Sequence, residues 1–248
     1  MTSSPTISAR DVCFGYSDDD VLHSVDLDLH RGEIVAIAGH NGSGKSTLIE
    51  ILAGVKEPRR GTVRRDGDLA LVVQRPSAPD ALPVTAAEVV RMGTWKRGRR
   101  LSRVGARRAV ERALGRVGMT DLADRPLAEL SGGQRQRVFL AQGLVREPGI
   151  LLLDEAAAGF DRESAVRMQR VLREEAARGA VVCSVTHDDE SIAAADRVIR
   201  LERGRVVADG ASGVVRAGPR DLLVVDVDHG PGPARRSGVG ERRGNPVA

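Results

Sequence analysis

The sequence predicts an α/β fold with a mostly parallel sheet, an antiparallel β subdomain and an inserted α-helical subdomain. Short apolar runs at 33–38, 69–73 and 150–154 indicate buried central strands, and segments with helical spacing lie between them. Hydrophobic residues make up 41% of the chain but aromatic residues only 2%, so the core must consist of Val, Leu, Ile and Ala. Such a core suits a parallel sheet with helices packed against it.

The first part of the chain predicts strands on either side of one helix. Residues 7–16 and 21–29 alternate apolar and polar side chains, as half-buried strands do. A helix is expected from Lys45 to near Gly54, because a glycine commonly follows the last helical residue. A further short strand is expected within 57–67, between two turns.

A helical insert is expected at about residues 78–128. Thr85 and Glu88 have the spacing of a capping box ahead of an apolar run, so a helix should begin there. Residues 102–118 are amphipathic with helical spacing. The α/β pattern then returns, with helices expected at 134–147 and 163–179, a strand at 180–186 and a hairpin at 196–210.

Composition predicts a single domain, residues 1–228, followed by a disordered basic tail, residues 229–248. The tail is rich in Gly, Pro, Arg and Ser and cannot bury enough apolar surface to fold. The net charge is +4, and positive charge gathers at 96–108 and in the tail. Such charge can attract nucleic acid or an anionic membrane. We favour a solvated helix face and expect no nucleic-acid partner.

The chain shows no feature of a secreted or membrane-spanning protein. Its N-terminus has no apolar core of a signal peptide, and no run approaches the roughly 18–20 apolar residues of a membrane span. If the protein works at a membrane, another subunit must hold it there. Cys13 and Cys183 lie singly in apolar runs, so we expect two buried thiols in a reducing cytoplasm.

The strongest motif is a phosphate-binding loop between a strand and a helix. Gly39, Gly44, Lys45 and Ser46 satisfy the pattern G-x-x-x-x-G-K-[ST]. Glycines let backbone amides surround a phosphate, Lys45 reaches the β- and γ-phosphates, and the Ser46 hydroxyl ligates Mg²⁺. The expected nucleotide contacts of this loop are Gly39, His40, Asn41, Gly42, Ser43, Gly44, Lys45, Ser46 and Thr47.

Two carboxylates at the end of an apolar strand complete the expected catalytic centre. The strand 150–154 delivers Asp154 to its C-terminal end, where it can hold Mg²⁺ or a water bound to it. Glu155 follows directly and can act as general base for the attacking water. An apolar run that ends in Asp-Glu is common and is weak evidence alone. Together with the phosphate-binding loop it is strong evidence for a nucleotide-hydrolysing site.

A second glycine-rich stretch, LSGGQRQR at 130–137, also predicts an anion site. Ser131 is a good N-cap, and Gly132 and Gly133 permit close approach to the helix N-terminus. With the two other motifs, it makes residues 7–210 resemble the ATP-binding subunits of ABC transporters, which are P-loop NTPases with a RecA-like core. The resemblance implies ATP and Mg²⁺ as cofactors.

The resemblance also implies a head-to-tail homodimer with ATP sandwiched between the subunits. Ser131, Gly132, Gly133 and Gln134 would bind the γ-phosphate of ATP held by the opposite subunit. Each chain would then contribute one loop to each of two shared sites. Two phosphate-binding loops in one domain therefore have a common explanation.

Four further residues match positions with known roles in that family. Tyr16 would stack on adenine, and Gln74 would sense Mg²⁺ and the membrane partner. His187 would contact the γ-phosphate, and Asp161 would couple the two sites. The resemblance thus gives Glu155, His187 and Lys45 as catalytic residues, and Ser46, Gln74 and Asp154 as metal ligands. The chain departs from the family pattern with Val73, Ala156 and Phe160, which affect loop stiffness rather than reacting groups.

Residues 80–100 indicate the transporter subtype. A similar Pro-Val-Thr, Val-Val and Met-Gly run occurs in the family's zinc and manganese importers, in a region that meets the transmembrane subunit. The implied partners are integral membrane permease subunits and, indirectly, an extracellular substrate-binding protein, with this chain on the cytoplasmic face of the membrane.

Other functions stay open from the sequence. Iron-siderophore importers share part of the 80–100 pattern, and an exporter is also possible. A soluble ABC ATPase acting on DNA or ribosomes usually has a long coiled coil or two fused cassettes, neither of which is present here. A regulatory nucleotide-binding module without turnover is disfavoured because both Glu155 and His187 are present.

Overall fold

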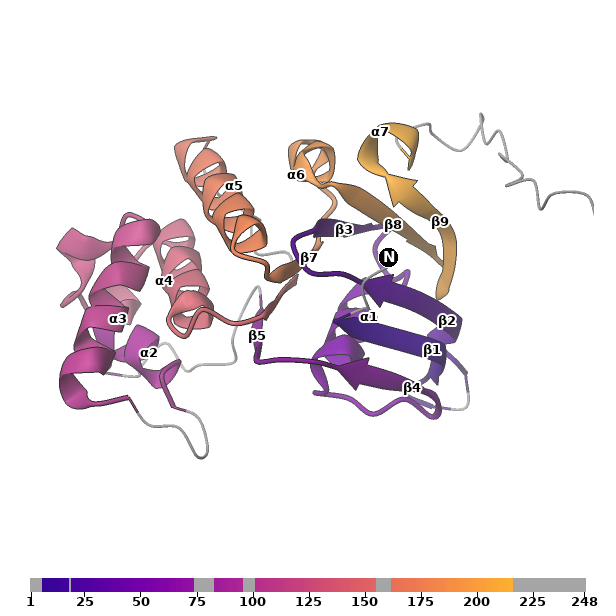
Figure 1. The fold of residues 1–248 in the computed structure, drawn as a ribbon, viewed down its shortest axis with the longest axis horizontal. Helices are drawn as coiled ribbons and strands as arrows, with labels where there is room; N and C mark the ends of the chain where they lie inside the picture. The colour runs from indigo at the N-terminus through magenta and orange to yellow at the C-terminus, as the bar shows by residue number, and fades with distance from the viewer. Residues whose placement is uncertain (1–5, 18, 74–82, 96–100, 155–161, 216–248) are drawn as a thin grey trace, which may run out of the picture. The chain divides into compact units, whose positions relative to one another are not determined.

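Two β-sheets form the framework of the residues that the computed structural model describes (Figure 1). The described residues lie within one compact unit and are 6–17, 19–73, 83–95, 101–154 and 162–215. The larger sheet has the strand order β5-β6-β7-β3-β8-β9, and the smaller has the order β2-β1-β4. In chain order the strands are β1 (Ile7–Phe14), β2 (Leu22–Leu29), β3 (Ile34–Ala38), β4 (Arg60–Arg65), β5 (Leu69–Val72), β6 (Ile150–Asp154), β7 (Val181–Val185), β8 (Arg197–Glu202) and β9 (Arg205–Ala211).

The larger sheet is parallel except at one edge. Neighbouring strands from β5 to β8 run parallel, and only β9 pairs antiparallel, with β8. The central strands β3, β6 and β7 are apolar nearly throughout because both of their faces are covered. The predicted mostly parallel core is therefore confirmed, as is the hairpin expected at 196–210.

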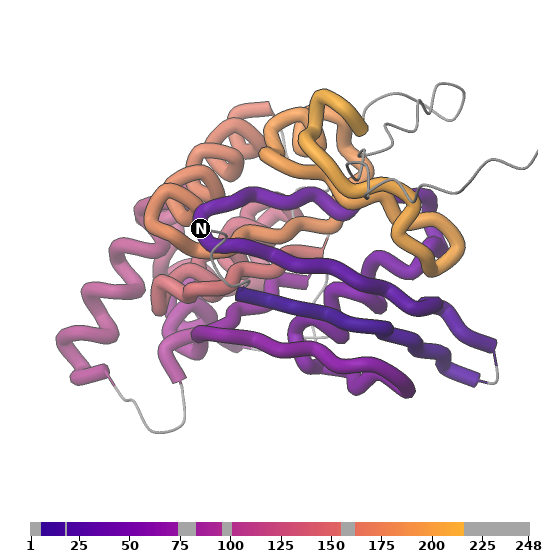
Figure 2. Tube along the Cα trace, turned by 45° about the vertical axis from the view of Figure 1, so that its right-hand side comes forward, coloured from indigo at the N-terminus to yellow at the C-terminus, as the bar shows by residue number. Residues whose placement is uncertain are grey.

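The smaller sheet is the predicted antiparallel β subdomain. Its strand β1 lies between β2 and β4 (Figure 2), with shifts of register near Asp11 and Cys13. We expected Cys13 to be buried, and this prediction is wrong: the irregular pairing leaves Cys13 partly exposed. Cys183, in the central strand β7, is buried as expected, and burial raises the pKa of its thiol to about 12.

The helices either contact the larger sheet or pack on a helix that does. They are α1 (Lys45–Ala53), α2 (Ala86–Met92), α3 (Arg103–Arg116), α4 (Gly132–Leu144), α5 (Arg162–Ala177), α6 (Asp189–Ala194) and α7 (Ser212–Val215), with single 3₁₀ turns η1 (Thr120–Leu122) and η2 (Leu127–Glu129). The sequence predicted the first five but neither α6 nor α7, whose short spans carry little periodicity. None of the helices in the described part of the chain is both long and apolar enough to cross a bilayer.

Alternating side chains of the larger sheet divide the core into two layers. On one face, Leu151 and Leu153 pack with residues of α2 to α5. On the other face, Leu152 and Cys183 pack with α1 and with the smaller sheet. The helices α1 and α4 therefore cover opposite faces of the same sheet (Figure 1).

The helices α2, α3 and α4 pack on one another, and their starts are fixed by side chains. Thr85 and Glu88 form the predicted capping box at the start of α2. The backbone N–H of Thr85 donates to the Glu88 carboxylate at 2.9 Å and lowers the pKa of Glu88. Ser102 caps α3 by accepting from the Gly105 N–H at 3.0 Å.

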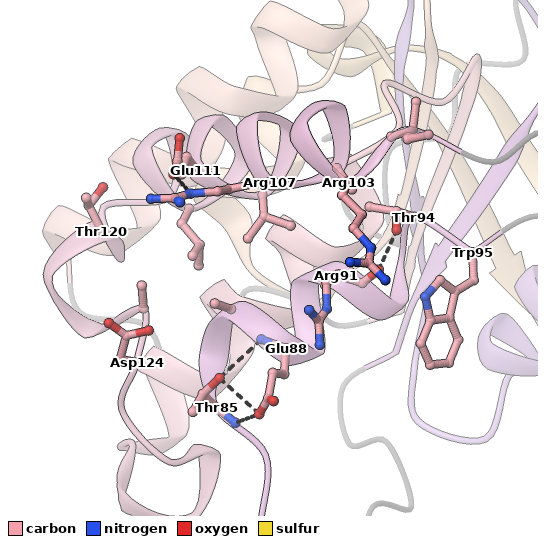
Figure 3. A pocket seen from close by; sticks show the side chains of 16 residues that line it. Thr85, Glu88, Arg91, Thr94, Trp95, Arg103, Arg107, Glu111, Thr120 and Asp124 are labelled. Carbon is pink, nitrogen blue, oxygen red and sulfur yellow. Dashed lines mark hydrogen bonds and ion pairs between the residues drawn. The ribbon is translucent and has the colours of Figure 1, made fainter.

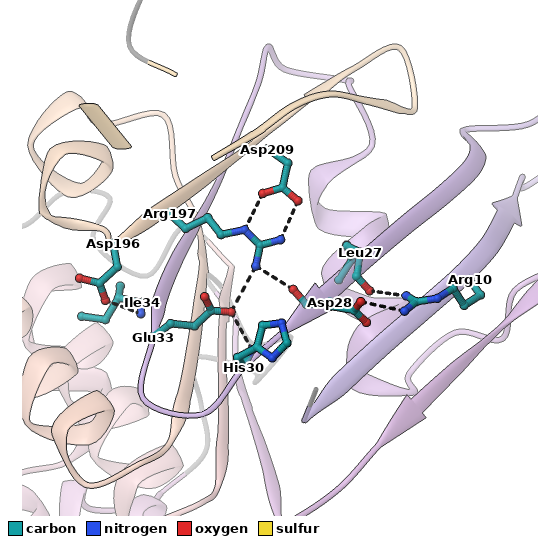
Figure 4. Close-up of polar contacts among 9 residues, drawn as sticks. All are labelled: Arg10, Leu27, Asp28, His30, Glu33, Ile34, Asp196, Arg197 and Asp209. Atoms are coloured by element: carbon teal, nitrogen blue, oxygen red, sulfur yellow. Dashed lines mark hydrogen bonds and ion pairs between the residues drawn. The ribbon is translucent and has the colours of Figure 1, made fainter. Parts of the chain in front are cut away.

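An arginine links the two sheets (Figure 4). Arg197, on β8 of the larger sheet, binds both oxygens of Asp209 at 2.5 and 2.6 Å, and this pairing raises its pKa. The same guanidinium donates to the Asp28 carbonyl, on β2 of the smaller sheet, at 2.9 Å and to Glu33 at 3.4 Å. Because a guanidinium is planar and has several donors, it can hold these partners at once.

A buried carboxylate joins α3 to α5. Glu175 is 1% exposed and accepts from Arg116 at 2.6 Å and from Arg178. Its neighbour Glu174 also pairs with Arg116, at 3.0 Å, but its side chain is 49% exposed. The two glutamates therefore share a partner but differ in burial.

We expect Glu175→Gln to lower the free energy of unfolding by about 1–3 kcal/mol, because the substitution weakens two charge-assisted bonds in a buried site. The control Glu174→Gln removes an equal charge from the surface and should change stability by less than about 0.5 kcal/mol. Urea denaturation of both variants measures the difference. Equal losses in the two variants would contradict the assigned role of burial.

Candidate functional site

The loop between β3 and α1 is held tightly against the sheet. A side chain at Gly39 would place Cβ 2.2 Å from the carbonyl oxygen of Leu201, and one at Gly44 would place it 2.8 Å from Leu22. Gly44 also has a φ of 101°, a left-handed conformation that favours glycine. As the N-cap, Gly44 supplies no side-chain bond, so the first-turn amides of α1 can bind an anion.

Lys45 lies folded over this loop. Its side chain is nearly buried, and Nζ donates to the carbonyl oxygens of Gly39 and His40, each at 2.8 Å. An ammonium group has three donors, so one more is available to a ligand. Within the described residues, Ser43 Oγ is buried without a hydrogen-bond partner, which fits a loop that receives an oxygen-rich ligand.

Parallel pairing brings Asp154 to the phosphate-binding loop. Asp154 is paired with Val185, which is itself paired with Ile37, at the end of β3. Across this edge, the Ser46 hydroxyl donates to Asp154 Oδ1 at 3.1 Å. Two residues 108 positions apart in the chain thus place a hydroxyl and a carboxylate oxygen in contact.

His187 lies at the same edge of the sheet. It follows Thr186, whose N–H donates to the Ile37 carbonyl at 3.2 Å and so extends the pairing of β7 with β3. The imidazole is exposed, and the next residue, Asp188, caps α6. The loop 39–46, Asp154 and His187 therefore meet at the carboxyl ends of three adjacent strands.

Tyr16 stands beside the first turn of α1. Its side chain is 65% exposed, and its hydroxyl lies 3.3 Å from Thr47 Oγ1. The ring meets Phe14 edge-on, with centroids 5.2 Å apart. An exposed aromatic ring thus contacts Thr47, which follows Lys45 by two positions, and this placement is compatible with stacking on a base.

The second glycine-rich stretch begins α4. Ser131 Oγ accepts from the Gln134 N–H at 3.3 Å, and Gln134 accepts from the Ser131 N–H at 2.9 Å. This capping box confirms Ser131 as the predicted N-cap, and Gly132 and Gly133 form the first helical turn. Because α4 and α1 cover opposite faces of the sheet, the structure does not bring Ser131 to the loop of its own chain.

Three predicted site residues, Gln74, Glu155 and Asp161, lie outside the described residues, as do Ala156 and Phe160. The boundary at 228 and the tail 229–248 lie there too. Their assignments therefore stay predictions. Val73, which precedes Gln74, directly follows β5.

A groove of about 1790 Å³ runs between α2 and α3 (Figure 3). Val110 and Leu114 contribute apolar surface to it, and Trp95 at its edge is 75% exposed. Arg91 and Arg103 lie toward the Trp95 end, and Asp124 lies at the opposite end. Glu88, Arg107 and Glu111 line the groove as well, so it combines apolar surface with side chains of both charges.

Sequence reasoning missed two supports of the site. Gly204, in the turn between β8 and β9, donates its N–H to the Ser43 carbonyl at 3.0 Å. Lys56 donates to the Tyr16 hydroxyl at 2.7 Å. Neither contact has a local sequence signal, although Lys56 is one of only three lysines in a chain whose other basic residues are arginines.

The family model and the most similar proteins that we compared point to one family. The family model described as ABC transporter matches residues 22–158, more than half of the chain. The zinc import ATP-binding protein ZnuC of Cereibacter sphaeroides is 40% identical over 217 residues, covering 86% of this chain and 85% of that protein. The hemin import ATP-binding protein HmuV of Rhodopseudomonas palustris is 35% identical, covering 91% and 92%. The aliphatic sulfonates import ATP-binding protein SsuB 1 of Nocardia farcinica is 39% identical, covering 92% and 90%.

Solved structures agree with the fold. A dimeric ATP-binding cassette in a post-hydrolysis state bound to ADP and Pi superposes with a TM-score of 0.76 at 25% identity, covering 83% of this chain and 98% of that chain. An inward-facing structure described as a metal-chelate type ABC transporter has a TM-score of 0.75 at 26% identity, covering 85% and 84%. From the family match and these near full-length alignments, the chain belongs to the ABC transporter family and is an ATP-binding ATPase.

Proposed function

We propose that this chain is the ATP-hydrolysing subunit of a metal ion importer for zinc or manganese, acting with a separate membrane permease. The observation that carries the ATPase site is the meeting of the loop 39–46, Asp154 and His187 at one edge of the sheet. The Pro-Val-Thr, Val-Val and Met-Gly run within residues 80–100 supports the choice of ion, and zinc import ATP-binding proteins are among the relatives, at 40% and 36% identity.

The site residues would divide the work of ATP hydrolysis. The loop amides and Lys45 bind the β- and γ-phosphates, for which the third ammonium donor of Lys45 is available. Glu155 takes a proton from the attacking water, and His187 contacts the γ-phosphate. Tyr16 stacks on the base, and Asp161 couples this site to the second one.

The oxygens of Ser46 and Asp154, together with Gln74, would hold Mg²⁺. A hydroxyl and a carboxylate in contact are the oxygen ligands that this ion takes from proteins, with phosphates and waters completing its shell. When bound, Mg²⁺ neutralises charge that develops on the phosphates.

We infer that ATP binds between two copies of the chain arranged head to tail. Ser131, Gly132, Gly133 and Gln134 start a helix on the face opposite α1, so they suit a phosphate held by a partner rather than by their own loop. The dimeric cassette among the similar structures supports the pairing of two copies.

The groove between α2 and α3 suits the permease. Its apolar surface, bordered by side chains of both charges, matches an amphipathic helix that has polar groups along its edges. The chain would then work at the cytoplasmic face of the membrane, held there by the permease. A substrate-binding protein outside the cell would act on it only through the permease.

Hemin import is the second candidate, because the hemin import relative aligns over 91% of this chain and 92% of its own length. Sulfonate import is the third candidate, because two sulfonate import relatives are 39% and 36% identical to this chain. These proteins share the ATPase core, so their similarity favours import without separating the cargoes.

We expect Glu155→Gln to lower ATP turnover by roughly 10²–10⁴-fold, because the amide cannot accept the proton of the attacking water. ATP binding should persist, and the variant should accumulate as an ATP-bound dimer. Steady-state hydrolysis and size-exclusion chromatography with ATP measure both effects. Near-normal hydrolysis by the variant would exclude Glu155 as the general base.

Mixing Lys45→Ala with Ser131→Arg tests the shared site. Each variant alone should be nearly inactive, because both sites of its dimer carry one lesion. A mixed dimer has one site with both lesions and one with neither. With random pairing of equal amounts, about a quarter of the sites are intact, so hydrolysis should partly return on mixing.

The control for this experiment is each variant at the same total concentration. The gain should appear only where dimers form, as a dilution series shows. Strict coupling of the two sites could hide the gain in hydrolysis. In that case a crosslink between position 131 and position 43 of the partner subunit, formed with ATP present, would show the head-to-tail dimer. No gain on mixing together with no such crosslink would contradict the head-to-tail dimer.

Deletion of the gene tests the cargo. Growth should slow only when zinc or manganese is scarce, and excess of that ion should restore it. Two further media provide the comparison, one with hemin as iron source and one with a sulfonate as sulfur source. A growth defect confined to either of these would replace the metal ion with that cargo.

A further inference from the structure

Lys56 connects the end of α1 to the loop that carries Tyr16. Its ammonium group donates to the Tyr16 hydroxyl at 2.7 Å and is paired with Glu50 of α1. It lies 4.7 Å from the centroid of the Tyr16 ring and 5.9 Å from that of Phe14. A compact ammonium with three donors can serve a hydroxyl and a carboxylate together.

The Tyr16 ring is held from one side only, through its hydroxyl and one edge. Lys56 and Thr47 contact the hydroxyl, and Phe14 contacts the ring edge-on. The side chain is 65% exposed, so the surrounding core does not fix its rotamer. The orientation of the ring therefore depends on these few contacts. Of the two contacts to the hydroxyl, the hydrogen bond from Lys56 is the shorter.

The supports of the Tyr16 hydroxyl come from the helix that follows the phosphate-binding loop and from the residues just after it. Glu50 and Thr47 are part of α1, whose first residue is Lys45, and Lys56 follows α1 by three positions. The contacts thus set the distance and angle of the ring relative to the phosphate-binding loop. A ring held in the orientation for stacking loses less entropy when a base binds to it.

We propose that Lys56 is a positioning residue for nucleotide binding: paired with Glu50, it holds the Tyr16 hydroxyl and fixes the ring where the base of ATP stacks. This inference rests on the proposed function, which places the base on Tyr16. Lys56 acts on the base through Tyr16, whereas Lys45 acts on the phosphates. The two lysines at the ends of α1 therefore have separate roles.

The contact can be measured directly, because Tyr16 is the only tyrosine in the chain. Tyrosinate absorbance as a function of pH reports on this residue alone. The hydrogen bond from Lys56 and the contact with Thr47 hold the pKa of Tyr16 below its ordinary value. In Lys56→Met the pKa should rise toward about 10. The control Arg64→Met removes an exposed positive charge from β4 and should leave the titration unchanged.

Binding measurements separate positioning from a general structural effect. Lys56→Met should weaken binding of Mg²⁺-ATP by roughly 2- to 10-fold, the effect of ordering one side chain. Binding of inorganic triphosphate, which has no base, should not change. Correspondingly, the KM for ATP should rise while kcat is retained, and Lys56→Arg should restore part of the affinity.

A double-mutant cycle with Tyr16→Phe tests whether the two residues act together. Tyr16→Phe keeps a ring that can stack but removes the hydroxyl, so its loss of ATP affinity should resemble that of Lys56→Met. The double variant should lose no more than either single variant, because both remove the same bond. Urea denaturation of each variant confirms that it is folded.

The remaining outcomes distinguish the two levels of the argument. If Tyr16→Ala weakens ATP binding but Lys56→Met does not, the positioning role is wrong and the stacking of Tyr16 stands. If Tyr16→Ala leaves ATP affinity unchanged, the base does not stack on Tyr16. The stacking role of Tyr16 and the positioning role of Lys56 are then both wrong. Equal losses for ATP and triphosphate in Lys56→Met, or an unchanged tyrosinate titration, would also overturn the role of Lys56.

Discussion

The parallel pairing of β3, β7 and β6 is the constraint on which the site depends. Parallel strands end at the same edge, so the residues that follow them meet in space although they are far apart in the chain. Ile37 is paired with Val185, and Val185 with Asp154. This register aligns the ends of the three strands, so the segments that follow them begin side by side. A shift of one residue in either pair would separate Asp154 from Ser46 and turn the buried apolar side chains of β6 to the opposite faces. Packing of the core and geometry of the site are therefore fixed by one register.

The same sheet separates the two glycine-rich helix starts of the domain. Its side chains alternate between two apolar layers, and each layer needs a helix to cover it. The helix α1 brings the loop 39–46 to one face, and α4 brings Ser131 to the other. The proposed head-to-tail pair would give each of these two positions a partner in the second chain. The layered fold, which places the two helix N-termini on opposite faces, is the observation that supports this proposal.

Local features were predictable from the sequence, and long-range polar contacts were not. The motif at 39–46, the apolar strands and the capping residues Thr85 and Ser131 depend on neighbours within a few positions. The partners of Arg197 and Glu175 depend on how distant segments pack, for which residue spacing gives no signal. Lys56 and Tyr16 are 40 positions apart, and only the folded β1 and α1 bring them together. Cys13 was misplaced for a related reason, since alternation assumes regular pairing and β1 is irregular there.

The groove and the helix that begins at Ser131 share one rigid support. At the end of α2, a side chain on Gly93 would place Cβ 2.2 Å from the Gln142 carbonyl oxygen, so the backbones of α2 and α4 are in close contact. Arg146, just after α4, donates to the Thr94 carbonyl at 2.6 Å and joins the same two ends. Because packed helices move as units, a displacement of α2 should also displace α4, and with it Ser131 at the opposite end. Under the proposed function, in which the permease binds the groove and Ser131 serves a partner's ATP, this contact would couple the position of Ser131 to the state of the permease.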